Sequence, residues 1–219
     1  MKIEPVAYFR SPISGKFGIP RQAGVAAGLK GRVVLEPAFR SPDALRGLEG
    51  FDYIWLIWEF NLNHEQKDCK LTVRPPRLGG NERIGVFASR SPFRPNPLGL
   101  SSVRIESIDA AAGVIEVSGA DIADGTPIYD IKPYVTYTDS HEDARSGFVD
   151  SHAWKRLEVR MSDEIAARLG DDRAPLESVL AEDPRPQYQD DPEKVYGMDF
   201  SGRNIRFRVY DDILEILSI

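Results

Sequence analysis

GVFASRSPFRPNPLGLS, residues 85–101, begins in one apolar run and ends in another, and the segment between the two runs holds two arginines, three prolines and an asparagine. Proline fixes φ and restricts the residue before it, so residues 91–97 are predicted to form a stiff, extended loop and no helix. Such a loop holds Arg90 and Arg94 in fixed positions, where guanidinium groups can bind a carboxylate or a phosphate in one orientation. The alternative is a proline-rich turn whose arginines pair with acidic neighbours.

Short apolar runs on both sides of this loop are typical of strands, because they are rich in β-branched and aromatic residues and end at Gly, Pro, Asn or Asp. Their regular spacing favours a β-barrel or a sandwich. The runs are residues 6–9, 32–35, 51–60, 71–73, 84–88, 98–108, 114–118 and 127–131.

One short helix is predicted at residues 41–48, where Ser41 is a capping residue, Pro42 takes the first helical position and Gly47 ends the helix. Long helices do not alternate with the strands, and no G-x-G-x-x-G follows a strand. A Rossmann unit is therefore not expected.

A polar segment, residues 137–151, is predicted to link a mainly β first domain, residues 1–140, to a second domain, residues 151–219. In the second domain the pattern predicts a strand, two short helices and a hairpin, at residues 154–160, 162–169, 175–182, 203–210 and 213–219. This second domain is therefore expected to be α+β.

The composition is that of a globular protein, with 42% hydrophobic and 28% charged residues in 219. No long apolar segment opens the chain, so we expect a cytoplasmic protein with no membrane segment. One cysteine, Cys69, and three histidines without ligand spacing (His64, His141 and His152) predict neither a disulfide framework nor a bound metal.

The charge distribution leaves nucleic acid open as a partner although the net charge is −6. Residues 74–104 contain six arginines and a single acidic residue, Glu82. Nucleic-acid binding depends on the local potential within about 8 Å at physiological salt more than on total charge. A basic face on an acidic protein is therefore possible.

Three further motifs combine groups that can bind or react. Pro20-Arg21-Gln22 joins a rigid residue, a bidentate cation and an amide, or is a surface turn. Residues 121–127 place two carboxylates in a turn too short for an EF-hand loop. In an extended segment Asp130, Lys132 and Tyr134 share one side, which is either a structural salt bridge or a proton-handling set. Ion pairs are far commoner than active sites, so the residues alone favour the salt bridge.

Taken together and in this order, the motifs resemble the TrmO (TsaA-like) family of S-adenosylmethionine-dependent tRNA N6-methyltransferases. The matching stretches cover nearly the whole chain: residues 20–22, 72–80, 85–101, 124–127, 130–134 and 183–186. The resemblance implies a small β-barrel methyltransferase domain outside the Rossmann class with a C-terminal α+β accessory domain. It also implies a homodimer with active sites near the subunit interface. The implied reaction methylates N6-threonylcarbamoyladenosine at position 37, in the anticodon loop of tRNA.

The resemblance also implies positions for the S-adenosylmethionine pocket. Carried over to this chain, they are Pro20, Arg21, Gln22, Asn61, Leu62, Arg90, Leu100, Asp121, Ile122, Ala123 and Asp124. Bacterial relatives can have histidine and glutamine where this chain has Asn61 and Leu62. Leu62 therefore offers backbone groups or apolar packing and no polar side-chain contact.

The chemistry suggests roles for the remaining residues. The target nitrogen lies between a purine and a urea-type carbonyl, and delocalisation makes it a poor nucleophile, so a base or a charge-stabilising donor should accelerate transfer. We assign Asp130 as candidate base or orienter, and Lys132 and Tyr134 as candidates for electrostatic stabilisation or positioning. Arg94 and Asn96 are candidates for binding the threonyl carboxylate or the anticodon-loop phosphates.

Two other functions stay open from the sequence. The same barrel could methylate another nucleoside or a small molecule. It could also be a non-catalytic module that binds S-adenosylmethionine or a nucleotide and regulates a partner. An intact set of Asp130, Lys132 and Tyr134 favours an enzyme.

Overall fold

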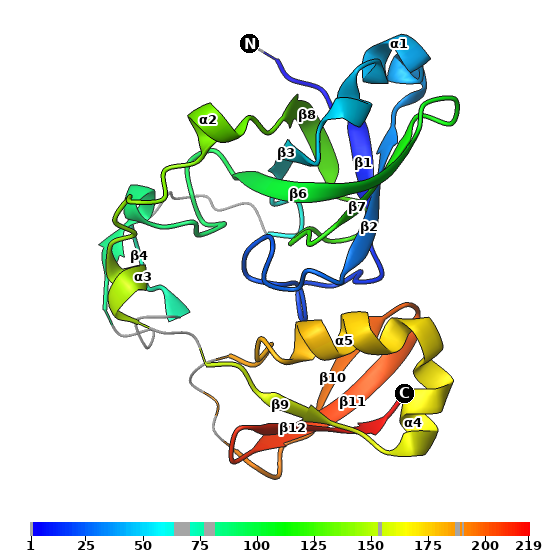
Figure 1. Cartoon of the computed structure of the whole chain (residues 1–219). Coiled ribbons are helices and arrows are strands. Elements are labelled where there is room, and N and C mark those ends of the chain that lie inside the picture. Colours follow the sequence, from blue (N-terminus) through cyan, green and yellow to red (C-terminus); the bar gives the residue numbers. More distant parts are fainter. Residues whose placement is uncertain (1, 64–70, 77–81, 153–154, 187–188, 190) are drawn as a thin grey trace.

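A computed structural model describes all residues of the chain except 1, 64–70, 77–81, 153–154, 187–188 and 190. Six strands form a closed barrel in the order β1-β2-β7-β6-β3-β8 (Figure 1). They are β1 (Ala7–Arg10), β2 (Lys30–Leu35), β3 (Tyr53–Glu59), β6 (Leu98–Asp109), β7 (Val114–Ser118) and β8 (Pro127–Pro133). All strand pairs in the barrel are antiparallel. The prediction of a mainly β, barrel-type first domain is confirmed.

Alternation along β3 shows how the sequence builds the barrel. Ile54, Leu56 and Trp58 are buried and face the interior, while Tyr53, Trp55 and Ile57, which alternate with them, face outward. The period of two places every second side chain on the same face of a strand. The interior is filled from all six strands by apolar residues such as Phe9, Val33, Val103, Ile115, Val117 and Ile128.

The helix predicted at residues 41–48 is shorter than expected. It is α1 (Pro42–Leu45), and the Ser41 hydroxyl accepts a hydrogen bond from the backbone N–H of Asp43 at 3.2 Å. Gly47 takes φ 88°, a left-handed conformation that ends the helix. Two 3-10 turns flank it, η1 (Pro37–Phe39) and η2 (Leu48–Gly50).

An arm outside the barrel holds the loop quoted first. β4 (Thr72–Val73) and β5 (Ile84–Gly85) form a separate two-stranded sheet. The predicted strand at 84–88 is wrong beyond Gly85, because its partner β4 offers two residues and Val86–Ala88 then turn into the 3-10 helix η4. Residues 91–97 contain neither helix nor strand, as expected from their prolines. Residues 77–80 of the matching stretch lie outside the described part.

The polar segment predicted to link the two domains, residues 137–151, overlaps two short helices that its composition did not indicate. They are α2 (Thr136–Asp139) and α3 (Phe148–Ser151). The carboxylate of Asp139 explains the first, because one oxygen accepts hydrogen bonds at 2.9 Å from the Val135 backbone N–H and from the Trp55 indole N–H. A side chain of the barrel thereby fixes the start of the segment.

The C-terminal part is a four-stranded sheet with two helices, as the α+β prediction expected. The sheet order is β10 (Tyr196–Phe200), β11 (Arg203–Tyr210), β12 (Ile213–Ser218) and β9 (Glu158–Arg160). α4 (Asp163–Leu169) and α5 (Arg173–Leu180) are joined by the 3-10 turn η5 (Gly170–Asp172). The strand predicted at 154–160 begins only at Glu158, Trp154 lies outside the described residues, and β10 was not predicted.

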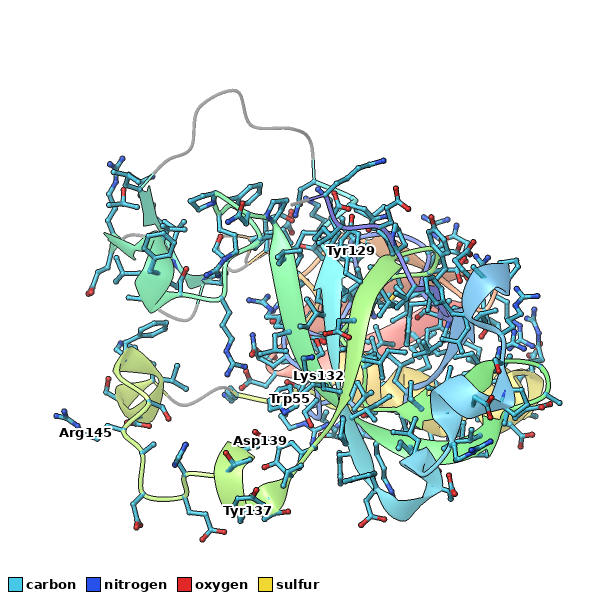
Figure 2. All side chains as sticks on the ribbon, turned by 90° about the horizontal axis from the view of Figure 1, so that it is seen from above. Trp55, Tyr129, Lys132, Tyr137, Asp139 and Arg145 are labelled. Carbon is cyan, nitrogen blue, oxygen red and sulfur yellow. The ribbon has the colours of Figure 1, made fainter. Side chains whose placement is uncertain are left out.

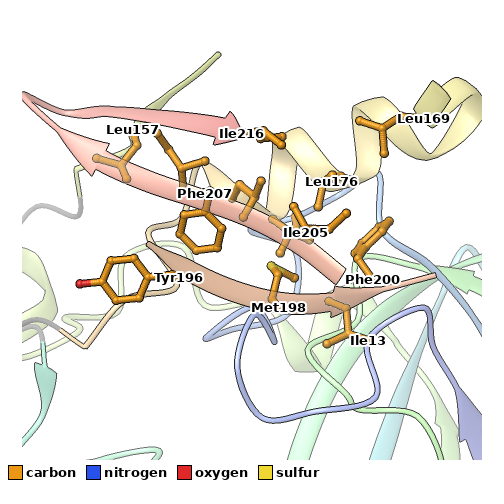
Figure 3. Packing of buried hydrophobic residues seen from close by; sticks show 14 of the residues in the cluster. Ile13, Leu157, Leu169, Leu176, Tyr196, Met198, Phe200, Ile205, Phe207 and Ile216 are labelled. Atoms are coloured by element: carbon orange, nitrogen blue, oxygen red, sulfur yellow. The ribbon is translucent and has the colours of Figure 1, made fainter. Parts of the chain in front are cut away.

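The core of the C-terminal sheet also includes residues from the N-terminal loop between β1 and β2. Ile13, Ala26 and Leu29 are buried in the same cluster as Phe200, Phe207 and other C-terminal residues. Figure 3 shows Ile13 beside Met198 and Phe200. The β1–β2 loop therefore packs between the barrel and the C-terminal sheet. Within the described residues, no helix has the length and apolar character needed to cross a membrane.

Candidate active site

Three of the predicted cofactor residues meet at one end of the barrel. The Arg90 guanidinium donates a hydrogen bond to the side-chain oxygen of Gln22 at 2.6 Å. Asp121 follows β7 and accepts a hydrogen bond from the Ser101 hydroxyl at 2.5 Å, and its carboxylate lies close enough to Arg90 for their charges to interact. Segments distant in the sequence thus place an amide, a cation and a carboxylate together.

A relay from the barrel core holds Asp121. The indole N–H of Trp58 donates to the Ser101 hydroxyl oxygen at 2.9 Å, and that hydroxyl in turn donates to Asp121. Ser101 and Trp58 are both buried on the inner face of the barrel. Burial raises the pKa of Asp121, and the Ser101 hydrogen bond and the charge of Arg90 offset part of that rise.

The raised pKa of Asp121 predicts how stability depends on pH. The folded state holds the proton more tightly than the unfolded chain, so stability from this group is fully present below the unfolded pKa of 3.8 and is lost as pH rises through the raised pKa. Asp121→Asn stays neutral throughout. The free energy of unfolding of the wild type should therefore fall relative to Asp121→Asn as pH rises across this range. Denaturant titrations at a series of pH values measure the difference, and parallel profiles for the two proteins would contradict it.

Neighbouring residues 20 and 21 face another way. The Arg21 guanidinium donates to the backbone oxygens of Asp183 at 3.3 Å and Arg185 at 3.1 Å, both in the C-terminal part. Pro20 is buried. The Gln22 side-chain N–H donates to the Arg21 backbone oxygen at 2.6 Å, so the two side chains of this turn point to different partners.

Two of the other predicted cofactor residues near this end, Asn61 and Asp124, already interact with other residues of the protein. The Asn61 side-chain oxygen accepts from the Thr126 hydroxyl at 3.3 Å, with half-buried Leu62 next to it. Asp124 accepts from the Ser11 backbone N–H at 3.0 Å and lies 3.9 Å from Arg10. The side chains of Ile122 and Ala123 are buried, which leaves their backbone groups as the means to contact a ligand.

The outer face of the barrel carries the predicted catalytic residues. Leu100, Ile57 and Asp130 are paired across β6, β3 and β8, so Leu100 and Asp130 lie two strand spacings apart, about 10 Å. Leu100 is 57% exposed. This row connects one predicted cofactor residue to the candidate base.

Asp130 and Lys132 form an ion pair on that face. Their charged atoms are 2.8 Å apart, and the side chains are 46% and 61% exposed, respectively. The ring of Tyr134 packs against Trp55 and Tyr53, with centroids 5.6 and 6.2 Å away. The three residues therefore share one side of the barrel, as the alternation predicted.

Aromatic residues at this face were missed from the sequence. Figure 2 shows Trp55 and Lys132 close together, with Asp139 of α2 nearby and Tyr137, also in α2, farther from them. Tyr137 is 91% exposed. The outward position of Trp55 in an alternating strand was the sequence signal that could have identified it.

The Tyr129 hydroxyl donates to the Glu59 carboxylate, which raises the pKa of Tyr129 to about 12.

The predicted substrate residues lie on the arm. Arg94 donates to the Ser89 backbone oxygen at 3.1 Å, which folds its side chain back along the loop, and Asn96 is exposed. Arg90 and Arg94 thus have different partners although they share a loop.

Two shallow hollows border the site. Asp130, Ile131 and Pro133 line the larger one, of about 460 Å³, together with apolar residues around α1. Asp124 lines the second, of about 380 Å³. Across the described residues, no three or more His, Cys, Asp or Glu side chains are grouped in a way that could hold a metal ion.

The fold and this barrel end define a class: a six-stranded barrel fused to an α+β domain. The model of the tRNA-methyltransferase O N-terminal domain matches residues 8–140, and the model of the TrmO C-terminal domain matches residues 155–219. The chain belongs to the TrmO family.

Individual relatives agree with this assignment. The Escherichia coli K12 tRNA (adenine(37)-N6)-methyltransferase is 36% identical over 229 residues, covering 100% of this chain and 97% of that protein. A Pseudomonas aeruginosa relative, 44% identical over 204 residues, covering 90% of this chain and 87% of that protein, carries S-adenosylmethionine-dependent methyltransferase in its name. The crystal structure of TrmO from Pseudomonas aeruginosa matches with a TM-score of 0.79 at 33% identity, covering 100% of this chain and 98% of that one.

Proposed function

We propose that the protein is a tRNA methyltransferase that uses S-adenosylmethionine to methylate N6 of adenosine 37, with N6-threonylcarbamoyladenosine as its substrate nucleoside. The observation that carries this proposal is the end-to-end match to a tRNA (adenine(37)-N6)-methyltransferase. The hydrogen-bonded Gln22, Arg90 and Asp121 at the barrel end support it.

The donor set at the barrel end fits S-adenosylmethionine. An amide, a guanidinium and a carboxylate complement the amino, carboxylate and ribose groups of such a ligand, and exposed Leu100 offers apolar contact. We propose Gln22, Asn61, Arg90, Leu100 and Asp121 as side-chain contacts, with backbone groups from residues 122–124. When bound, S-adenosylmethionine supplies an electrophilic methyl group and leaves as S-adenosylhomocysteine. We expect no metal in this site.

On the protein side, the main tasks are to align the nucleoside and to manage the N6 proton. As N6 forms its bond to the methyl carbon, the carbon–sulfur bond breaks and the N6–H proton must leave. Asp130 is the proposed acceptor of that proton or the group that orients N6–H. Lys132, 2.8 Å from Asp130, would hold the carboxylate in place and stabilise charge on the carbamoyl oxygen.

Tyr134 and its aromatic neighbours suit an unpaired base. Tyr134 packs against both Tyr53 and Trp55, and Trp55 lies next to Lys132. Aromatic faces beside a cation are a common platform for bases of RNA loops. We propose Tyr134 as a positioning group here, and Arg94 and Asn96 as contacts to the threonyl carboxylate or to phosphates.

The assembly and the location are also proposals. Exposed Leu98 and Leu100 lie two residues apart on the outer face of β6 and offer an apolar contact to a second copy, which supports a homodimer with active sites near the interface. A tRNA substrate supports a cytoplasmic location. Two apolar cores, one inside the barrel and one at the C-terminal sheet, support the division into domains at residues 1–140 and 151–219, although the β1–β2 loop of the first domain also contributes to the second core.

Mass spectrometry of nucleosides tests the proposed function. Unmodified tRNA and tRNA that carries N6-threonylcarbamoyladenosine would each be incubated with the protein, methyl-labelled S-adenosylmethionine and EDTA. We expect label only in the N6-methyl derivative of the threonylcarbamoyl nucleoside. Label in another nucleoside would mean that the proposed substrate is wrong. Absence of label in both tRNA samples would reject the proposal that the protein is a tRNA methyltransferase.

Arg90 and Arg94 should have separable effects. Arg90→Ala removes the partner of Gln22 and a charge near Asp121, so S-adenosylmethionine affinity should fall by roughly 10- to 100-fold, the range for losing a charged hydrogen bond. Arg94→Ala should leave that affinity nearly unchanged and raise the KM for tRNA. Calorimetry and steady-state methylation measure the two quantities. Equal losses of cofactor affinity in both variants would show that the division of roles is wrong.

A further inference from the structure

The turn that holds the proposed cofactor contact Gln22 is attached to the C-terminal domain. The β1–β2 loop begins with the Pro12 oxygen accepting from the Ser201 N–H and the Ser14 hydroxyl donating to Asp199, at 2.8 and 2.7 Å. Phe17 stacks on Tyr196 and Phe207, with centroids 6.3 and 6.2 Å away. The loop is therefore anchored to β10 and β11 before it reaches Gln22.

Gly18 shows how closely this loop approaches the sheet. A Cβ at Gly18 would lie 2.4 Å from the Met198 side chain, and its φ of 94° is one that other residues rarely adopt. Close approach without a side chain brings the following residues, 20–22, against the C-terminal turn at 183–185.

That C-terminal turn is itself rigidly built. The Arg185 guanidinium donates to both carboxylate oxygens of Asp183 at 2.9 and 3.0 Å, and both side chains are only 12% exposed. The Arg185 backbone N–H also donates to Asp183, whose φ is 50°. A bidentate pair with this little exposure fixes the directions of the turn's backbone oxygens. Two of those oxygens, of Asp183 and Arg185, accept from Arg21.

From Arg21 the contacts continue to the barrel end. Gln22 donates to the Arg21 backbone oxygen and accepts from Arg90, and the Gly24 N–H donates to the Gly119 oxygen at 2.8 Å. One chain of hydrogen bonds therefore runs from the Asp183–Arg185 pair to the groups proposed to hold S-adenosylmethionine.

We propose that the Asp183–Arg185 turn of the C-terminal domain positions the cofactor loop through Arg21, and that Arg21 is a positioning residue and not a cofactor ligand. This inference rests on the proposed use of S-adenosylmethionine. The C-terminal domain then has a defined task in the barrel site: it sets the geometry of residues 22–24 before the ligand arrives. Such preorganisation improves affinity because the loop does not have to be ordered on binding.

Hydrogen–deuterium exchange of the ligand-free protein tests the positioning role without any cofactor. In Arg21→Ala, the amides of residues 22–24 should exchange on the order of 10-fold faster than in the wild type, because the loop opens more often. Arg208→Ala is the matched control, since Arg208 pairs with Glu215 at 2.8 Å on the opposite face of β11. Unchanged exchange at residues 22–24 in Arg21→Ala would overturn the proposal.

A double-mutant cycle on S-adenosylmethionine affinity separates positioning from direct contact. Arg21→Ala and Asp183→Asn should each weaken binding on the order of 10-fold, and the double variant should bind like Arg21→Ala alone, since both act through one chain of contacts. If the losses of affinity from the two single substitutions multiply in the double variant, Arg21 contacts the cofactor directly, and its assignment as a positioning residue is wrong. If Asp183→Asn lowers the melting temperature without changing affinity in the folded protein, the turn is only structural and the proposal is wrong.

The same measurements show whether a failure lies in the proposed function. If the wild-type protein does not bind S-adenosylmethionine, the proposed function is rejected. The exchange experiment would still show whether Arg21 and the Asp183–Arg185 turn position residues 22–24. If Asp183→Asn does not fold, Arg21→Lys replaces it, because a lysine keeps the charge but cannot donate in fork geometry to two carbonyls. Wild-type exchange at residues 22–24 in Arg21→Lys would also count against the proposal.

Discussion

Asp130→Asn is expected to slow methyl transfer by about 10²–10⁴-fold, the usual contribution of a general base, while S-adenosylmethionine affinity stays within about twofold. Asparagine keeps the size of the side chain but cannot accept the N6 proton or carry the charge that pairs with Lys132. Single-turnover methylation of threonylcarbamoylated tRNA with saturating cofactor measures the chemical step apart from binding and product release.

The exposure of this ion pair makes the test decisive. Pairs as exposed as Asp130 and Lys132 contribute about 0.2–1 kcal/mol to stability, so the variant should stay folded and a slow rate could not be assigned to unfolding. Glu158→Gln is the matched control, because Glu158 and Arg160 are also two residues apart on a strand and paired at 2.7 Å. A wild-type rate in Asp130→Asn with a lower melting temperature would remove Asp130 from the catalytic residues.

Gly99→Ala is expected to lower the stability of the protein more than other single glycine-to-alanine substitutions in the proline-rich loop or in β6. A Cβ at Gly99 would lie 2.2 Å from the Trp58 ring, which packs directly over this glycine from the paired strand. Overpacking of this kind costs about 1–3 kcal/mol, which for a protein of this size lowers the melting temperature by roughly 2–12 °C. Thermal unfolding measures the loss.

The same substitution should weaken cofactor binding. The Trp58 indole holds the Ser101 hydroxyl, which holds Asp121, so a displaced ring disturbs the carboxylate at the barrel end. Gly85→Ala is the control, because nothing lies within 4 Å of a Cβ there and its φ is −60°. If Gly99→Ala matches Gly85→Ala in stability and in S-adenosylmethionine affinity, the proposed link between core and site is wrong.

The individual strands and helix starts were largely predictable because the information for them is local. Alternation of buried and exposed residues along β3 and β11, and the caps at Ser41 and Ser162, depend on neighbours in the sequence. The predictions failed where the chain's conformation depends on a distant partner. α2 depends on the bond between Asp139 and Trp55, 84 residues apart. The strand predicted at 84–88 stops at Gly85 because its antiparallel partner β4 offers only two residues for pairing.

For the site, the sequence alone determined which chemical groups are present and that Asp130, Lys132 and Tyr134 share a face, because a strand alternates with period two. The motif resemblance correctly indicated the family. Only the tertiary structure decided that Gln22 meets Arg90, and that Arg21 turns toward the C-terminal domain. Closure of the barrel and packing of the β1–β2 loop against β10 bring these residues together, and no local pattern encodes contacts that span 68 to 164 residues.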